Sequence, residues 1–323
     1  MSDWTLARAV SRLGQLGVVS GTALDSILAR RLQDGDPGGH FRRAIAEFPV
    51  RSVADEILDR FFLPKGREGQ PYVALPMYNQ VVKPVREQLA VLANFVEVWL
   101  AKEGHDGVVG VNLLTKIQTP NLSSLYGAIL AGVDAVLMGA GIPREIPGVL
   151  DGLARHEPVS MTFDVVGLER GESELLEFDP RTMWDGEPPP VRRPYFLPIV
   201  ASNSLATMMA RKATGAVNGF IIEGPTAGGH NAPPRGPVQL NEEGEPIYGE
   251  RDVVDLDKLR ELELPFWIAG GAGRPGRLKE MRDRGAAGIQ VGTLFAYCRE
   301  SGLEAGLKAD IIRRCREGTI HVK

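Results

Sequence analysis

The sequence has few of the residues that mark secreted or membrane proteins. Only two of its 323 residues are cysteines, Cys298 and Cys315. They form neither a disulfide framework nor a metal cluster, which fits a reducing compartment. No apolar run is long enough to span a bilayer, and no basic segment followed by an apolar one marks a signal peptide. We therefore expect a cytoplasmic protein.

Neither positive nor negative charge is in large excess. The formal net charge of -4 and the isoelectric point near 5.8 give no electrostatic reason to expect nucleic acid or an anionic membrane as a partner. Metal-ligand spacings such as His-Glu-x-x-His are also missing, so no metal site is expected. With 43% hydrophobic residues the chain can bury a sizeable core, and one α/β barrel is a normal use of this length.

Three apolar segments run directly into glycines: Gly219–His230, Ile268–Gly273 and Gly288–Phe295. A short apolar run bounded by glycines is typical of a strand that is buried on both faces. Helical stretches lie between these runs, so we expect parallel strands whose carboxyl ends share one face. Glycine there lets backbone N–H groups approach phosphate oxygens closely. The alternative is that these glycines only make tight turns.

At these residues the chain resembles the flavin-dependent family that contains the nitronate monooxygenases and the flavin enoyl-ACP reductases. The resemblance extends from about residue 5 to about residue 303 and implies a (β/α)8 TIM barrel that binds FMN at the carboxyl ends of its strands. The family's Ala-Gly-Gly-His motif matches Ala227, Gly228, Gly229 and His230, and its Ala-Gly-Gly motif matches Ala269, Gly270 and Gly271. Its Gln-x-Gly-Thr motif matches Gln290, Gly292 and Thr293, and its Gly-Val-Asn strand matches Gly110, Val111 and Asn112.

The N-terminal part departs from the family pattern. Only Met1–Trp4 precede the first helix, where the family has its first barrel strand, so that strand is apparently absent and we expect a shortened chain. Two insertions are expected within a single FMN-binding domain of residues 1–323, at about 24–82 and about 165–194. The first is either a lid or dimer surface, or a tolerated decoration. Pro158–Val165 alternates as a strand and is expected to pair with Tyr195–Ser202.

The candidate catalytic residue is His230. Nitronate monooxygenases carry their proposed catalytic His at the end of another strand, where this chain has Gly139. Proton transfer needs a side chain of suitable pKa, and an unperturbed imidazole titrates at about pH 6.5. His230 stands on a glycine-rich strand end, so we expect it to face the substrate. The alternative is that it caps its own loop or orders Asn231.

The resemblance implies that FMN is held by Gly228, Gly229, Gly270, Gly271, Gln290, Gly292 and Thr293, with Asn112 and Glu223 contacting its ring or ribityl region. Glu223 stands where many relatives carry Gln, which would place a charge near the flavin.

The predicted function is oxidation of alkyl nitronates or similar small anions with O2. Two alternatives stay open. The Gly139-Ala-Gly141 sequence favours an NAD(P)H-dependent flavin enoyl-thioester reductase, and the missing strand favours a barrel subunit or partner of a larger synthase. A homodimer is also left open.

Overall fold

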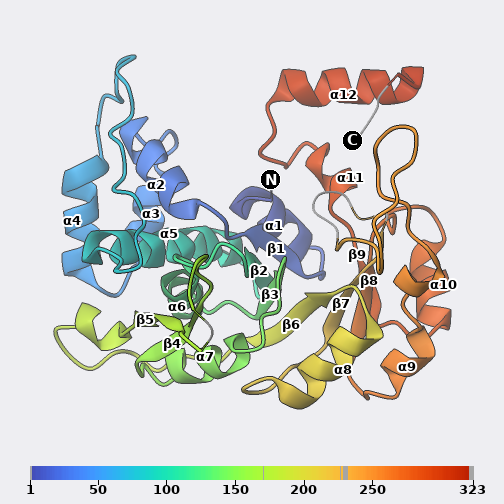
Figure 1. Cartoon of the computed structure of the whole chain (residues 1–323). Coiled ribbons are helices and arrows are strands. Elements are labelled where there is room, and N and C mark those ends of the chain that lie inside the picture. Colours follow the sequence, from blue (N-terminus) through green and yellow to red (C-terminus); the bar gives the residue numbers. More distant parts are fainter. Residues whose placement is uncertain (1, 170, 226, 228–231, 320–323) are drawn as a thin grey trace.

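The fold is built on one parallel sheet of seven strands, which Figure 1 shows between an N-terminal group of helices and the C-terminal helices. The computed structural model describes residues 2–169, 171–225, 227 and 232–319. The sheet has the order β1-β2-β3-β6-β7-β8-β9, and all its neighbours are parallel. Its strands are β1 (Gly17–Ser20), β2 (Val109–Leu114), β3 (Ala135–Gly139), β6 (Tyr195–Val200), β7 (Phe220–Glu223), β8 (Phe266–Ala269) and β9 (Gly288–Gln290).

The parallel α/β class predicted from the sequence is confirmed, as a curled, TIM-barrel-like sheet. The strands follow one another in chain order, as in a barrel, but within the described residues β9 does not pair with β1. Residue Ser2 lies along the free edge of β1. The N–H group of Ser20 donates to the carbonyl of Ser2 at 2.8 Å, and the hydroxyl of Ser2 donates to the carbonyl of Val18 at 2.6 Å.

Helices connect the strands and cover one face of the sheet. Outside the segment 24–82 the helices are α1 (Trp4–Ser11), α5 (Pro84–Lys102), α6 (Asn121–Leu130), α7 (Ile146–Leu153), α8 (Asn203–Lys212), α9 (Leu256–Arg260), α10 (Arg277–Asp283), α11 (Thr293–Ala296) and α12 (Ala305–Glu317). Unlike the others, α11 and α12 have no buried residue. The short 3-10 helices are η1 (Pro180–Met183) and η2 (Glu250–Asp252). No helix in the described residues combines the length and apolar character needed to cross a membrane.

The strands are buried on both faces, and alternate residues belong to two separate apolar clusters. Val19, Val111 and Val136 belong to the large core that the strands share with the helices. The residues beside them in sequence, such as Val18 and Leu137, belong to a smaller cluster on the other face. Because side chains alternate along a strand, this smaller cluster marks the concave face of the curled sheet.

Trp267 on β8 fills part of the concave face, and two glycines make room for it. A Cβ added at Gly219 would lie 3.0 Å from Cζ3 of the indole, and one added at Gly288 would lie 2.9 Å from Cδ1. Both distances are shorter than ordinary carbon contacts, so a larger residue at either position would displace the indole.

The segment 24–82, predicted to be an insertion, contributes to the main core. Its helices are α2 (Leu24–Gln33), α3 (His40–Ala46) and α4 (Arg51–Phe61), and their buried residues join those of α5 in one cluster. Residues 62–83 contain neither helix nor strand. Tyr78 from this segment donates to Asp25 at 2.8 Å, and Arg86 of α5 donates to the same carboxylate at 2.6 Å. The buried ion pair joins the starts of α2 and α5, and the hydrogen bond from Tyr78 attaches the segment to it.

The segment 165–194, predicted to be an insertion, contributes β5 to a separate hairpin, and here the sequence-based pairing was wrong. β4 (Val159–Phe163) pairs antiparallel with β5 (Glu174–Phe178), whereas the segment 195–200 joins the main sheet as β6. Strand alternation identifies a strand but not its partner, because pairing depends on contacts distant in sequence. Tyr126 fastens this insertion, since its hydroxyl lies 2.7 Å from Nδ1 of His156 and accepts a hydrogen bond from the Trp184 indole at 2.8 Å.

Glu97 is a buried carboxyl group in the middle of α5. It accepts a hydrogen bond from the N–H group of Trp4 at 3.0 Å and so ties the start of α1 to α5. Burial raises the pKa of Glu97 to about 7. Because the carboxyl group ionises more readily in the unfolded chain, the native state loses stability as the pH rises from the ordinary glutamate range to about 7.

We expect Glu97→Gln to flatten this pH dependence. The wild-type free energy of unfolding should fall by roughly 2–3 kcal/mol between pH 4.5 and pH 8 through this group, and the variant should lose that fall. Urea denaturation at a series of pH values measures it. Glu56→Gln, on the exposed side of α4, is the control. An unchanged slope in Glu97→Gln would contradict the assignment.

Candidate active site

Two of the predicted cofactor residues, Glu223 and Gln290, end the strands on either side of β8. Glu223 of β7 is in register with Ala269 of β8, which is in register with Gln290 of β9. Ala269 belongs to the concave cluster, so Glu223 and Gln290 face the concave side as well. The sequence-based expectation that these segments converge on one face agrees with this geometry.

Asn112 shares the concave face but stands on the other half of the sheet. It is in register with Ser20 on β1 and with Leu137 on β3, which is a member of the concave cluster. Among the described residues the side chains of Asn112, Glu223 and Gln290 have no hydrogen-bond partner, and all three residues are half-buried. Half-buried polar groups without partners cost free energy unless a ligand or water satisfies them, so their presence on one face favours a binding site.

Burial alone accounts for the electrostatics of Glu223. It raises the pKa of this carboxyl group above the ordinary glutamate value, and no charged group among the described residues offsets the effect. A perturbed carboxyl group in a concave site is a recognised indicator of function.

The glycines after β8 and the glycine after β9 differ in backbone conformation and in the space around them. Gly270 has φ +94° and Gly271 has φ +56°, and a Cβ at Gly270 would lie 2.9 Å from the backbone nitrogen of Ala227. Gly292 has ordinary φ, and a Cβ added there would meet nothing within 4 Å. The first two glycines are required by the backbone. Gly292 leaves open space beside the site.

Free backbone donors lie beside these glycines. The N–H groups of Gly271 and Ala272 after β8, and of Gly292 and Thr293 after β9, donate to no acceptor among the described residues. Convergent N–H groups at the ends of neighbouring strands form the kind of site that binds phosphate. These residues therefore fit the phosphate group of a flavin nucleotide.

Part of the predicted site lies outside the described residues. Gly228, Gly229 and His230 belong to this part, so the placement of His230 toward a substrate stays a prediction.

The structure gives a physical reason for the missing histidine on β3. Met138 is in register with Pro198, and the next residues along these two strands, Gly139 and Ile199, both lie on the concave face. A Cβ added at Gly139 would lie 2.8 Å from the Cβ of Ile199. The space that a side chain at position 139 would need is therefore occupied by β6.

One further polar residue, Thr115, follows the strand that carries Asn112 and was not predicted from the sequence. The hydroxyl of Thr115, directly after β2, is buried and has no hydrogen-bond partner within the described part of the chain. Its only sequence signal is its position three residues after Asn112, which by itself is weak.

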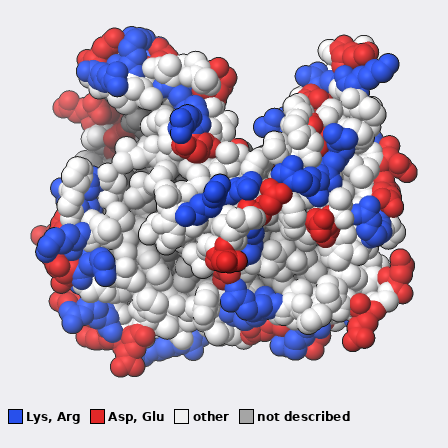
Figure 2. Space-filling model, turned by 180° about the vertical axis from the view of Figure 1, so that it is seen from behind, with Lys and Arg blue, Asp and Glu red and all other residues white. Residues whose placement is uncertain are grey.

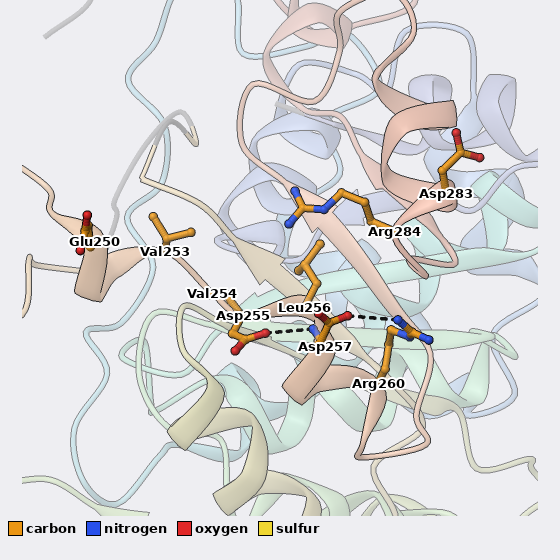
Figure 3. A pocket seen from close by; sticks show the side chains of 9 residues that line it. All are labelled: Glu250, Val253, Val254, Asp255, Leu256, Asp257, Arg260, Asp283 and Arg284. Carbon is orange, nitrogen blue, oxygen red and sulfur yellow. Dashed lines mark hydrogen bonds and ion pairs between the residues drawn. The ribbon is translucent and has the colours of Figure 1, made fainter.

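A cavity of about 650 Å3 lies elsewhere, between η2, α9 and the end of α10 (Figure 3). Two of its charged residues pair with each other. Asp257 accepts from Arg260 at 3.0 Å, and Asp255 accepts from the backbone nitrogen of Asp257 at 3.0 Å. No strand end contributes to its lining, so we place the candidate site on the sheet instead.

Figure 2 shows basic and acidic residues interspersed over one face of the molecule, with a hollow between two projections. In the opposite view of Figure 1, the projections correspond to α12 and to the extended segment 62–83. This face carries no single-sign charge field of the kind that attracts nucleic acid.

The comparisons with known proteins agree with the sequence motifs. Residues 194–321 match the family model described as nitronate monooxygenase, which confirms the predicted resemblance over β6–β9 and the helices that follow. No curated protein matches the chain.

Three solved structures are similar at low identity. FabK from Thermotoga maritima has 18% identity and a TM-score of 0.48, with 96% of this chain and 60% of that chain covered. A point mutant of the same protein has 18% identity and a TM-score of 0.49, with 96% and 64% covered. The enoyl reductase domain of MlnA from Bacillus amyloliquefaciens has 13% identity and a TM-score of 0.39, with 70% and 49% covered. The chain thus spans less than two thirds of each of these proteins.

We expect the two concave-side glycines to respond oppositely to substitution. Gly139→Ala forces the new Cβ against Ile199 and should lower the free energy of unfolding by about 1–3 kcal/mol. Gly292→Ala enters open space and should leave stability within about 0.5 kcal/mol of wild type. Chemical denaturation of both variants measures this. Equal stability of the two would contradict the close packing of β3 on β6.

Proposed function

We propose that this chain is an FMN-dependent oxidoreductase that oxidises alkyl nitronates or similar small anions with O2. The observation that carries the proposal lies at the ends of β7, β8 and β9. Free backbone N–H groups after β8 and β9 stand beside the side chains of Glu223 and Gln290, which have no hydrogen-bond partner among the described residues. The match of residues 194–321 to the nitronate monooxygenase family supports the same class.

In this proposal the phosphate of FMN is bound by the backbone after β8 and β9. Gly270 and Gly271 allow the close approach, and Gly292 and Thr293 complete the cradle. Asn112, Glu223 and Gln290 hold the ring or ribityl region from the concave face, and Gly228 and Gly229 extend the cradle. When bound, FMN supplies the electron acceptor, while the protein's part is binding, orientation and exclusion of water. His230 faces the substrate.

The remaining proposals concern the whole protein. We propose a single FMN-binding TIM-barrel domain with insertions at about 24–82 and about 165–194, acting in the cytoplasm on a small-molecule substrate. We also propose a homodimer, which sedimentation would test.

One observation favours a second function, an NAD(P)H-dependent flavin enoyl-thioester reductase. Gly139 cannot carry the family's usual histidine because Ile199 fills that space, and an enzyme that receives hydride from NAD(P)H does not need that base. The binding-subunit alternative would be favoured by a protein that takes up no flavin.

The deciding experiment is the visible absorption spectrum of the protein with FMN added, followed by anaerobic addition of NADH or propyl-2-nitronate to separate samples. Bleaching by the nitronate alone would support the proposal, and bleaching by NADH alone would support the reductase. A protein that never binds FMN would contradict both.

We expect Asn112→Ala and Gln290→Ala each to weaken FMN binding about 5- to 10-fold, because each removes a hydrogen bond worth about 1–1.5 kcal/mol. Titration monitored by flavin fluorescence measures the dissociation constant. Gln70→Ala, on the exposed segment 62–83, is the matched control and should bind as wild type. Unchanged binding in both site variants would place the flavin elsewhere.

A further inference from the structure

Three loop segments meet beyond the carboxyl ends of β2 and β3, on the side of the sheet that carries the candidate site. The N–H group of Lys116, after β2, donates to the carbonyl of Ala140, after β3, at 3.2 Å. The side chain of Gln118 accepts a hydrogen bond from the N–H group of Asp164, after β4, at 2.8 Å and donates to the carbonyl of Asp164 at 3.2 Å. The segments after β2, β3 and β4 are therefore held side by side.

Each of these segments exposes large apolar side chains next to the hydrogen-bonded residues. The exposed fraction is 40% for Ile117, 57% for Ile142 and 39% for Val165, and Val166 is fully exposed. We call these four residues the apolar rim. Single exposed apolar side chains are normal on a protein surface, but a group of them beside a candidate site is typical of a binding surface.

The rim continues into a cavity of about 250 Å3 in the hairpin of β4 and β5. Val165 and Val166 line this cavity together with the apolar side chains of Phe163 and Leu168. A concave surface covers more of an apolar group than a flat one does, and so removes more of its area from water. The rim and the cavity together therefore suit an elongated apolar group that starts at the strand ends.

Charged residues give this surface a direction. Lys116 and Arg144 adjoin rim residues after β2 and β3, both are exposed, and neither side chain has a hydrogen bond or ion pair among the described residues. The nearby carboxylates of Asp164 and Glu172 belong to the lining of the cavity in the hairpin. An occupant with one negative end would therefore place that end toward the strand ends and its uncharged end at the hairpin.

We propose that the apolar rim binds the alkyl tail of the substrate, so that the enzyme prefers long-chain alkyl nitronates to short ones. The inference rests on the proposed function and deepens it. The anionic head of the substrate enters the concave site, and the chain leaves this site across the ends of β2 and β3 toward the hairpin. No bond forms or breaks at the rim, because its part is to bind the tail.

The test compares oxidation of the nitronate anions of 1-nitropropane, 1-nitrohexane and 1-nitrooctane by the FMN-loaded protein. The quantity measured is the ratio of kcat/KM for the octyl substrate to kcat/KM for the propyl substrate. Wild type is compared with Ile142→Ser, Val166→Ser and the double variant. The matched control is Leu13→Ser, which replaces an 80% exposed side chain before the start of β1, at the opposite end of the sheet. Thermal melts accompany each variant.

We expect kcat/KM of the wild type to rise about twofold for each added methylene group, or about 30-fold from propyl to octyl, because an open surface buries each group only in part. The double variant should lower the octyl-to-propyl ratio at least about fivefold, and Leu13→Ser should keep the wild-type ratio. A wild-type ratio near one, or a ratio that the double variant leaves unchanged, would overturn the inference while the proposed function stands.

A binding measurement separates failure of the rim from failure of the proposed function. Calorimetric titration with decanoate and butanoate uses anions that are not oxidised. If no nitronate is oxidised, the proposed function fails, but binding of decanoate that the double variant weakens at least fivefold would still support the rim. Equal binding of the two carboxylates would overturn it. If the double variant instead turns a dimer into a monomer in sedimentation and keeps the wild-type ratio, the rim is an interface between copies and the inference fails.

Discussion

The structure depends on the alternation of side chains along seven parallel strands that are buried on both faces. One set of residues, exemplified by Val111 and Phe196, packs against the helices and forms the main core. The other set, exemplified by Leu137 and Leu197, lines the concave side. Because the period is two, a polar residue placed at the last concave position of a strand, such as Glu223, must face the same space as its apolar predecessors. The site therefore follows from the sheet.

Glycine serves two opposed purposes on this concave side. Gly139, Gly219 and Gly288 are positions where a neighbouring side chain, either Ile199 or Trp267, fills the space that a Cβ would need. Gly292 is a position where that space is open. The three packed glycines let neighbouring side chains fill the concave face densely, and Gly292 leaves space for a ligand. A sequence shows both as the same letter, and only the surrounding atoms separate a packing glycine from a binding glycine.

Local sequence patterns predicted much of the fold, but they could not predict strand pairing or contacts between residues far apart in the chain. The apolar runs ending at Glu223, Ala269 and Gln290 identified strands and their common face, because strand ends in parallel sheets converge. The partner of β4 was predicted wrongly, since alternation carries no information about pairing. The packing of Ile199 against Gly139 and the hydrogen bond from Trp4 to Glu97 could not be predicted either, because each joins residues far apart in the chain. The role of His230 rests on the sequence alone.

The contrast between Glu97 and Glu223 shows how position separates a structural carboxyl group from a chemical one. Burial raises the pKa of both. Glu97 lies inside a helix of the core, and a backbone N–H group from α1 satisfies one of its oxygens. Glu223 lies at the end of a strand, on the side where free N–H groups and open space gather, and no described group satisfies it. A protein gains stability by pairing or removing such a group. Because Glu223 has no partner among the described residues, its position at a strand end favours a role in binding a ligand.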